Sequence, residues 1–365
     1  MCFVFVAEKG VVAIFGPLSK SASEHIRSIT DSMEIPFIET RWNYRSQKVI
    51  GANSGSGYAF NLHPDITSLG GAYLDILEAY HWETITILYQ DNDSFMTLKK
   101  ILEKTGSVGP MDKFRLVVKQ LVKNKNGYRD VLNEIFQSES NLIVLDCEKY
   151  ILEEVLKQCQ QVGLISQGYS FLLTSLDGHT VNLDDFKYGG TNITALRMVN
   201  THRPEVQAVI WGIVEGIMDR EMRSANVMVP EGNLDTTTAL IYDSVNAFAL
   251  ALNELTSVQQ VYQSNLDCSG EQTWVHGNSL MNYMKMVEFM GLTGPIKFDN
   301  QGLRTQFELD LMELQLEGLE RVGSWNSLDH LISGRKPANI DSEANSDPMA
   351  NKTFIITTIL VKEES

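Results

Sequence analysis

The chain opens with an apolar run that is followed by an amphipathic helix pattern. Val11 to Phe15 is continuously apolar and ends at Gly16-Pro17, which is typical of a strand buried on both faces of a parallel sheet. Apolar residues then recur at helical spacing as far as Met33, and Ser19 or Ser21 is placed to cap that helix. The pattern predicts a strand followed by a helix.

This alternation of strand and helix continues to about residue 200. Apolar runs at 35–40, 84–90, 114–122 and 141–147 predict strands, and helical patterns such as 66–80 lie between them. Such regular alternation indicates βαβ crossovers, in which parallel sheets carry helices on both faces. We therefore predict an α/β fold with two doubly wound parallel sheets.

The last third of the chain changes in character twice. Two apolar stripes predict helices that face the core, and residues 291–326 contain strands broken by turn residues. The stripes consist of Val206, Val209, Ile210, Ile213, Val214, Ile217 and Met218, and of Ile241, Val245, Phe248, Leu252 and Leu255. A polar segment at 329–352 reads as a linker, and an apolar strand at 353–361 follows it.

Length and charge narrow the classes of protein. A chain of 365 residues fits two domains, and a net charge of -16 argues against nucleic acid as a partner. The acidity is best explained as a solvated surface. No apolar run is long enough to span a membrane, and MCFVFVAEKG lacks the basic lead of a signal peptide.

Local motifs for catalysis are absent from the sequence. There is no P-loop, no G-x-S-x-G and no paired-cysteine metal motif, and the 7 histidines are isolated, so we expect no metal and no cofactor. Asp146-Cys147 at a strand end resembles a catalytic elbow, but a strand-terminal acid beside a buried thiol is the commoner explanation. An enzyme is therefore only a distant alternative.

Ligands of open parallel sheets bind beyond the carboxyl ends of the strands. Those positions are residues 17–23, 39–42, 90–94 and 147–149. Ser19, Ser21 and Ser23 at a helix start, with Thr40 nearby, form a candidate receptor for a carboxylate, although simple helix capping explains one of these serines. Arg41-Trp42 is expected to fill the opening, so the sequence favours an occluded cleft.

Several blocks of the sequence resemble the amino-terminal domain of kainate-type ionotropic glutamate receptor subunits. They are GVVAIFGP, IPFIETRW, FNLHPD, HWETITILYQ, NLIVLDC, TNITALRMVN, ALIYDSVNAFALAL and the long block that begins GLTGPIKFDNQG, and they span residues 10–326. NKTFIITTIL resembles the first strand of the glutamate-binding domain that follows in such receptors. The resemblance implies a two-lobed clamshell of the periplasmic-binding-protein type.

The resemblance also implies domain boundaries. Lobe one would comprise residues 1–82 and 201–292, lobe two residues 83–200 and 293–328, and residues 353–365 would begin a truncated glutamate-binding domain. Helices 19–33 and 66–80 are then expected at the face where two subunits pair. The family starts lobe one with a further βα unit ahead of GVVAIFGP, so that unit is expected to be missing, and the chain alone is expected to aggregate.

The function implied is non-enzymatic. Such a domain lies outside the cell on a postsynaptic, glutamate-gated cation channel, directs assembly with other subunits as a dimer of dimers, and modulates gating. Glutamate and the membrane would be engaged by parts of the receptor beyond this chain. The alternative is an amino-acid-binding clamshell that holds its ligand at Ser19, Ser21, Ser23 and Thr40.

The resemblance implies two kinds of covalent modification as well. A family disulfide would join Cys2 to Cys268, and N-glycosylation would use Asn92, Asn192 and Asn351. The GANSGSG stretch would be an inserted loop, which costs little because loop-closure entropy grows only slowly with length.

Overall fold

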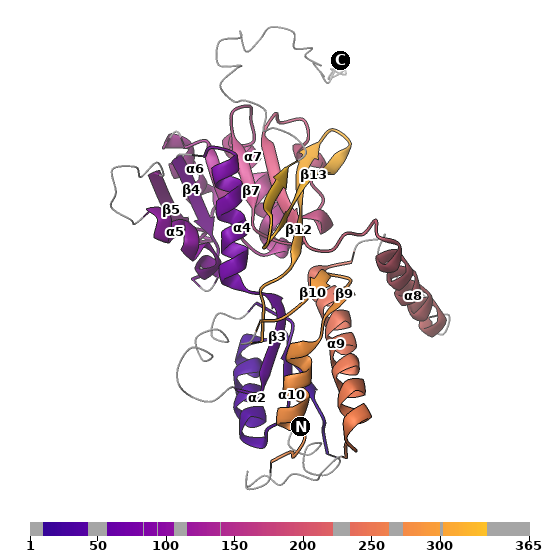
Figure 1. Ribbon diagram of the computed structural model, residues 1–365. Coiled ribbons are helices and arrows are strands. Elements are labelled where there is room, and N and C mark those ends of the chain that lie inside the picture. The colour runs from indigo at the N-terminus through magenta and orange to yellow at the C-terminus, as the bar shows by residue number, and fades with distance from the viewer. Residues whose placement is uncertain are drawn as a thin grey trace, which may run out of the picture. The chain divides into compact units, whose positions relative to one another are not determined.

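The computed structural model describes residues 10–42, 57–82, 84–92, 94–105, 115–138, 140–221, 234–262, 273–299 and 302–333. All of these residues belong to one compact unit, Met1–Gly334. Its two larger sheets each organise a separate set of helices (Figure 1). We call the part built on the four-stranded sheet lobe one and the part built on the eight-stranded sheet lobe two.

Lobe one contains a short parallel sheet in the order β1-β2-β3-β11. Its core joins the sheet to apolar residues of three helices, among them Met33, Ala247 and Leu280. The strands are β1 (Ile14–Phe15), β2 (Phe37–Glu39), β3 (Ala59–Pro64) and β11 (Leu303–Arg304), and the helices are α2 (Lys20–Met33), α9 (Thr236–Val258) and α10 (Gly277–Met286). A hairpin of β9 (Phe289–Gly291) and β10 (Gly294–Ile296) follows α10.

Strand β1 differs from its prediction. It covers only two residues, and Phe15 is 39% exposed although a strand buried on both faces was expected. In the described part of the sheet β1 pairs only with β2, so it lies at the edge. An edge strand receives packing from one neighbour, which explains the exposure.

Lobe two is built on the order β14-β13-β12-β8-β7-β6-β4-β5. Strands β4 to β8 pair in parallel, whereas β12, β13 and β14 extend the sheet in antiparallel fashion. The strands are β4 (Thr84–Tyr89), β5 (Arg115–Gln120), β6 (Leu142–Asp146), β7 (Ser170–Leu173), β8 (Asn192–Arg197), β12 (Glu308–Gln315), β13 (Gly318–Asn326) and β14 (His330–Ser333). The predicted parallel sheet is thus present with an antiparallel extension.

Helices cover both faces of the lobe-two sheet. One core cluster includes Leu132 and Val155, from α6 and α7, and the other includes Leu69 and Ile101, from α4 and α5. These helices are α4 (Ile66–Ala79), α5 (Lys99–Thr105), α6 (Arg129–Gln137) and α7 (Lys149–Val162), with short 3₁₀ turns η1 (Ser94–Leu98), η2 (Gly178–Thr180) and η3 (Asp184–Phe186). This doubly covered arrangement is what the alternating sequence pattern predicted.

Helix α4 packs in a different lobe from the one expected. Tyr73, Ile76 and Leu77 are buried in the same cluster as strand residues of the eight-stranded sheet, such as Ile85. The expected boundary at residue 82 had placed this helix in lobe one. The chain instead passes from the first sheet to the second directly after β3, because the apolar face of α4 fits the broad lobe-two sheet.

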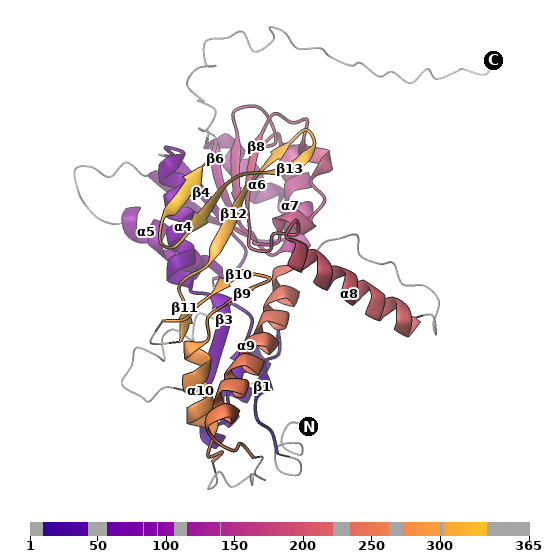
Figure 2. The ribbon, with the colours of Figure 1, turned by 45° about the vertical axis from the view of Figure 1, so that its right-hand side comes forward.

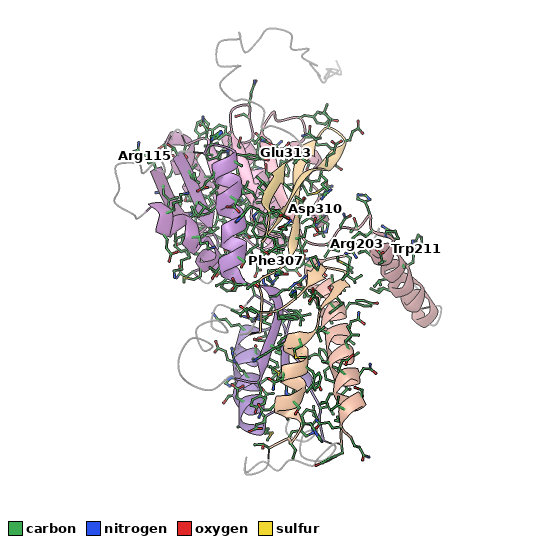
Figure 3. The ribbon with its side chains drawn as sticks, in the orientation of Figure 1. Arg115, Arg203, Trp211, Phe307, Asp310 and Glu313 are labelled. Atoms are coloured by element: carbon green, nitrogen blue, oxygen red, sulfur yellow. The ribbon has the colours of Figure 1, made fainter. Side chains whose placement is uncertain are left out.

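A buried ion cluster stabilises the antiparallel extension. Arg197 of β8 bonds Asp310 of β12 at 2.8 Å, and Arg321 of β13 bonds the other oxygen of Asp310 at 2.5 Å. Figure 3 shows Asp310 on β12, with Phe307 just before that strand. Because Asp310 is only 6% exposed, both of its oxygens need such donors.

The two helices after residue 203 depart from their predicted stripes. In α8 (Pro204–Glu221) Val206 and Ile210 are buried, but Trp211 is 63% exposed, and in both Figure 1 and Figure 2 the far end of this helix lies away from α9. In α9 the predicted core residues Ile241 and Val245 are exposed. Its buried face consists of Ala239, Leu240, Asp243, Ser244, Ala247, Ala251 and Leu255. Of the predicted stripe, Leu255 is buried and Phe248 and Leu252 pack against the core in part, so only its first two residues face outward.

Candidate functional site

A cavity of about 760 Å³ lies where the strands of both lobes end. The residues predicted from strand ends that line it include Thr40, Arg41 and Trp42 after β2, Gln90 after β4 and Lys149 after β6. The loop after β7 and the start of α9 complete the wall with Ser175, Leu176, Asp177, Thr236 and Thr237. The rule that ligand sites lie beyond the carboxyl ends of parallel strands therefore located the cavity.

Arg41 and Trp42 line this cavity, so the expectation that they would fill it was wrong. The Arg41 guanidinium turns back to its own wall, where Nη1 donates to the carbonyl oxygen of Leu18 and Nε to that of Trp42, both at 3.3 Å. Asn61 Nδ2 donates to the Arg41 carbonyl oxygen at 3.0 Å. These bonds hold the segment against lobe one and leave the cavity open.

The four residues proposed as a carboxylate receptor do not come together at the cavity. Thr40 lines it, but Ser19, Ser21 and Ser23 are not among its lining residues. Ser19 is the N-cap residue of α2 without a side-chain capping bond, and its hydroxyl lies 3.4 Å from that of Ser21. The buried Ser23 hydroxyl donates to the carboxylate of Glu39. That carboxylate would repel a ligand carboxylate at this point.

The lobe-two wall carries an acid and a thiol without nucleophilic character. Thr174 Oγ1 donates to Asp146 Oδ1 at 2.6 Å, and the Tyr73 hydroxyl donates to the Thr174 carbonyl oxygen at 3.1 Å. Burial, reinforced by the charges of Asp146 and Glu148, raises the pKa of Cys147 to about 12. The thiol is therefore protonated at neutral pH and unsuited to nucleophilic attack.

The histidine of the cavity is also uncharged. Burial is the main cause that lowers the pKa of His63 to about 4, and the positive charge of Arg304 acts in the same direction. The ring nitrogen Nδ1 lies 3.0 Å from the carbonyl oxygen of Pro64. Within the described ranges, no three His, Cys, Asp or Glu side chains are grouped so that they could hold a metal ion.

Two polar contacts cross this cavity to the start of α9. Lys149 Nζ, on the first residue of α7, lies 3.0 Å from Asp235 Oδ2, and Asp177 Oδ1 accepts the backbone N–H of Thr236 at 2.7 Å. The sequence analysis selected residue 149 as part of a strand end, but it did not find Asp177 or Asp235. The one available signal was Asp235 ahead of three threonines, which is a typical N-cap pattern.

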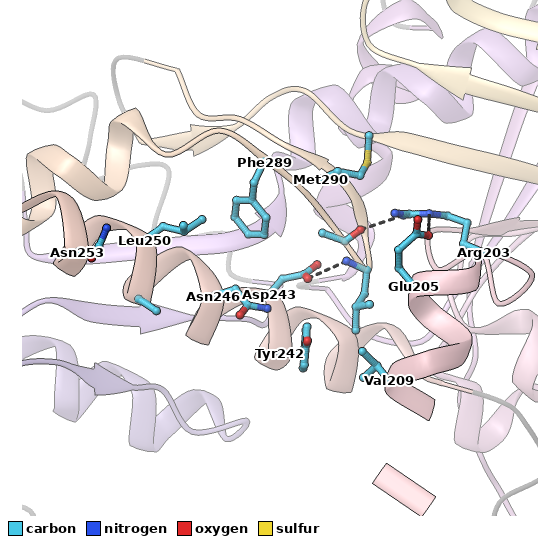
Figure 4. A pocket seen from close by; sticks show the side chains of 13 residues that line it. Arg203, Glu205, Val209, Tyr242, Asp243, Asn246, Leu250, Asn253, Phe289 and Met290 are labelled. Atoms are coloured by element: carbon cyan, nitrogen blue, oxygen red, sulfur yellow. Dashed lines mark hydrogen bonds and ion pairs between the residues drawn. The ribbon is translucent and has the colours of Figure 1, made fainter. Parts of the chain in front are cut away.

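A second, smaller hollow of about 420 Å³ lies along α9 (Figure 4). Arg203 Nη1 donates to the carbonyl oxygen of Gly291 at 2.9 Å and closes one end of it. Beneath it, the buried Asp243 accepts the backbone N–H groups of Leu292 and Thr293 at 2.8 and 2.9 Å. The α9 residues Tyr242 and Leu250 are part of its lining.

Exposed apolar residues follow the outer side of α9 beside this hollow. We call Ile241, Tyr242, Val245 and Leu250 the α9 outer face; their exposed fractions are 43%, 42%, 49% and 44%. Ile241, Tyr242 and Val245 are neighbours on the helix surface, whereas Leu250 lies about half a turn around the helix from Ile241, in the lining of the hollow. Neighbouring exposed apolar side chains are typical of a surface that contacts another polypeptide.

A family model described as "Receptor family ligand binding region" matches residues 1–317. The chain belongs to this receptor family. It is 30% identical over 355 residues to mouse "Glutamate receptor ionotropic, kainate 1", a match that covers 96% of this chain and 40% of the relative. The human protein of the same name is 29% identical over 370 residues, with 96% and 38% covered. The chain thus spans about two fifths of the length of these relatives.

These comparisons confirm the resemblance to a kainate-type domain and the periplasmic-binding-protein-like α/β fold. Members of this kind are receptors and channels, so the non-enzymatic interpretation is confirmed as well. None of the helices in the described ranges combines the length and apolar character that a bilayer crossing requires.

The modification sites divide between described and undescribed residues. Cys2, Cys268 and Asn351 lie outside the described residues, as does the predicted strand at 353–365. Asn92 and Asn192 are exposed. Cys147 and Cys159 are buried free thiols, so neither forms a disulfide in the structure.

Proposed function

We propose that this chain is the extracellular amino-terminal domain of a kainate-type glutamate receptor subunit, and that it directs pairing with other subunits and modulates gating. The observation that carries the proposal is similarity over 96% of this chain to a kainate receptor more than twice as long. The chain therefore corresponds to one part of a larger channel subunit. Agonist binding and ion conduction are assigned to other parts of such a subunit.

The surface of lobe one supports pairing through that lobe. The exposed positions of α2 are polar, among them Glu24, His25 and Ser28, whereas α9 carries the apolar outer face. Because α4 packs in lobe two, helix 66–80 is a poor candidate for the same interface. We propose that α2 and the α9 outer face together make the first contact between subunits.

Sedimentation equilibrium of the full chain, alone and mixed with the amino-terminal region of mouse kainate 1, tests this assignment. We expect a dimer alone or in the mixture, and weaker association of the double variant Ile241→Asp/Val245→Asp. Tyr188→Asp is the matched control, because Tyr188 is 81% exposed and lies in lobe two. A monomer in every sample, or equal effects of the two changes, would contradict pairing through lobe one.

The remaining features of the proposal follow from membership of such a receptor. We propose residues 1–82 and 201–292 as lobe one and 83–200 and 293–328 as lobe two, with three changes that the structure requires. Helix α4 packs in lobe two, and β11 (Leu303–Arg304) pairs with β3 in lobe one. Strand β14 (His330–Ser333), which was expected within the linker at 329–352, pairs with β13 in lobe two. We also propose a Cys2–Cys268 disulfide, glycosylation at Asn92, Asn192 and Asn351, a postsynaptic location, and a dimer of dimers in the assembled receptor.

A second candidate function is binding of a free amino acid in the cavity between the strand ends. The cavity favours it, since its 760 Å³ would accommodate an amino acid and its lining carries charges of both signs, such as Arg41 and Asp146. The Glu39 carboxylate under Ser23 opposes it at the predicted receptor. Isothermal titration with glutamate and other amino acids decides, since micromolar binding would favour this candidate and no heat would leave assembly as the function.

A further inference from the structure

The contacts at the start of α9 join two bodies that are otherwise packed separately. Lys149 and Asp177 belong to lobe two, at the start of α7 and after β7, while α9 packs through Ala247, Ala251 and Leu255 in the core of lobe one. Any movement of the N-terminus of α9 therefore moves the core of lobe one with it. The two contacts lie at the wall of the cavity, since Lys149, Asp177 and Thr236 all line it.

The contact between Asp177 and Thr236 uses the start of α9, where the first backbone N–H groups have no partner within the helix backbone. Asp235 Oδ1 caps α9 from within by accepting the N–H of Thr238 at 2.9 Å. The N–H of Thr236 is instead taken by Asp177 of lobe two at 2.7 Å. The positive end of the helix dipole favours a carboxylate at this position. Asp177 therefore occupies the place that the anionic group of a bound ligand would take.

The ion pair between Lys149 and Asp235 is a second link between the lobes, and in this link lobe two supplies the cation and lobe one the carboxylate. Lys149 carries its charge from lobe two to Asp235, and the two side chains are 21% and 28% exposed, so water screens them only in part. Burial alone would lower the pKa of Lys149, but its hydrogen bond to Asp235 and the charges of Asp177 and Asp235 raise it. Burial would likewise raise the pKa of Asp235, yet the bonds from Thr238 and Lys149 lower it.

We propose that Lys149, Asp235, Asp177 and the N–H of Thr236 form an internal latch that holds the two lobes closed over the cavity without a ligand. Asp177 acts as a built-in carboxylate for the start of α9. A clamshell that closes on its own side chain keeps one fixed spacing between its lobes. The latch requires no particular pairing partner, so it stands independently of the proposed assembly function.

Hydrogen–deuterium exchange of the full chain tests the latch. In Lys149→Met and Asp177→Ala we expect amides at 40–42, 146–149 and 174–177 to exchange about tenfold faster, since each variant removes a charge-assisted hydrogen bond. Lys157→Met is the matched control on the same helix, because it removes only exposed ion pairs, with Glu153 and Asp185, that lie within lobe two. Asp177→Asn, which keeps an acceptor oxygen, should show a smaller increase than Asp177→Ala.

The position of the faster exchange separates a latch from a simple helix cap. Loss of a cap alone would speed exchange only at 235–240, at the first turns of α9, and that result would overturn the proposal. Unchanged exchange at 40–42, on the opposite wall, would overturn it as well. A cycle of Lys149→Met and Asp235→Asn should show coupled effects on exchange at 40–42, whereas additive effects would contradict a shared ion pair.

Discussion

Individual residues decide which chemistry the cavity permits. At neutral pH Cys147 is protonated and His63 is uncharged, so the thiol is a poor nucleophile and the imidazole is a weak base, although both residue types are common in catalytic sites. Their environment, more than their identity, sets their charge. Arg304 is a further example of a residue whose surroundings matter. It is fully buried, but its guanidinium donates to Thr293 Oγ1 at 2.8 Å and to the Thr293 carbonyl oxygen at 2.9 Å.

His63 makes stability depend on pH in a defined window. Its pKa is lowered to about 4 from an ordinary value of 6.5, so between these values the unfolded chain binds a proton that the folded chain excludes. The free energy of unfolding should fall as pH drops from 6.5 to 4, by at most about 3 kcal/mol. The pKa of His179 is also lowered by burial, which adds loss in the same direction.

Urea unfolding at several pH values checks this expectation with His63→Gln. The variant cannot gain a proton, so its stability should decline less than that of the parent chain between pH 6.5 and 4. His202→Gln serves as control because His202 is exposed. If the free energy of unfolding depends on pH equally in the parent chain and in His63→Gln, the burial of His63 does not contribute to the pH dependence of stability.

The site could be predicted in part from the sequence at the residue scale. Thr40, Arg41 and Lys149 were found because strand ends can be read from apolar runs, and strand ends of parallel sheets converge. Asp177 could not be found, since it caps a helix that begins 59 residues later in the chain. Ser23 was misjudged because its buried partner Glu39 comes from a neighbouring strand.

At the scale of elements, helix starts differ in what holds them. Asp65 caps α4 through Oδ2, which accepts the N–H of Ser68 at 2.8 Å and its hydroxyl at 3.0 Å, and Asp65 is only 7% exposed. Ser19 stands at the same position of α2 without a capping bond from its side chain. The sequence analysis suggested Ser19 or Ser21 as a cap by residue type, but it did not single out Asp65.

Alanine substitutions should separate these two helix starts. Asp65→Ala should lower the free energy of unfolding by about 1–2 kcal/mol, the usual loss for a bonded N-cap, and Ser19→Ala by only a few tenths. Urea unfolding midpoints give both values. Equal losses would mean that the serine caps α2 in solution, which would also make Ser19 unavailable to a ligand.

The sequence predicted whether a segment is a strand or a helix better than it predicted which sheet the segment packs against. The alternating runs gave strands and helices close to their observed bounds, because burial on both faces leaves a continuous apolar run. The lobe of α4 was wrong, since an apolar stripe does not say which sheet it meets, and the stripe of α9 was wrong at Ile241 and Val245 but correct at Leu255. In α9, Ala247 and Ala251 face the core together with Leu240 and Leu255, whereas Val245 faces out, so apolar character alone did not identify the buried side.

At the scale of the whole molecule, the two lobes differ in the size of the sheet and the core that stabilise them. Lobe two has eight strands with a core cluster on each face, whereas the described part of lobe one has four strands, two of them only two residues long. Lobe one also carries the exposed α9 outer face. Among the described residues, the smaller sheet and the edge position of β1 predict that lobe one unfolds more readily than lobe two.

Tryptophan fluorescence can follow each lobe during urea unfolding. Trp274 is buried in lobe one at 1% exposure, and Trp82 and Trp325 are buried in lobe two at 3% and 2%. We expect the Trp274 signal, isolated by comparison with Trp274→Phe, to change at a urea concentration about 1 M lower, which corresponds to a difference of about 2 kcal/mol at a common slope. A single coincident transition for all three would show that the latch between Lys149 and Asp235 makes the lobes one cooperative unit. In that case Lys149→Met should split the transition, because it removes the ion pair through which the lobes share their stability.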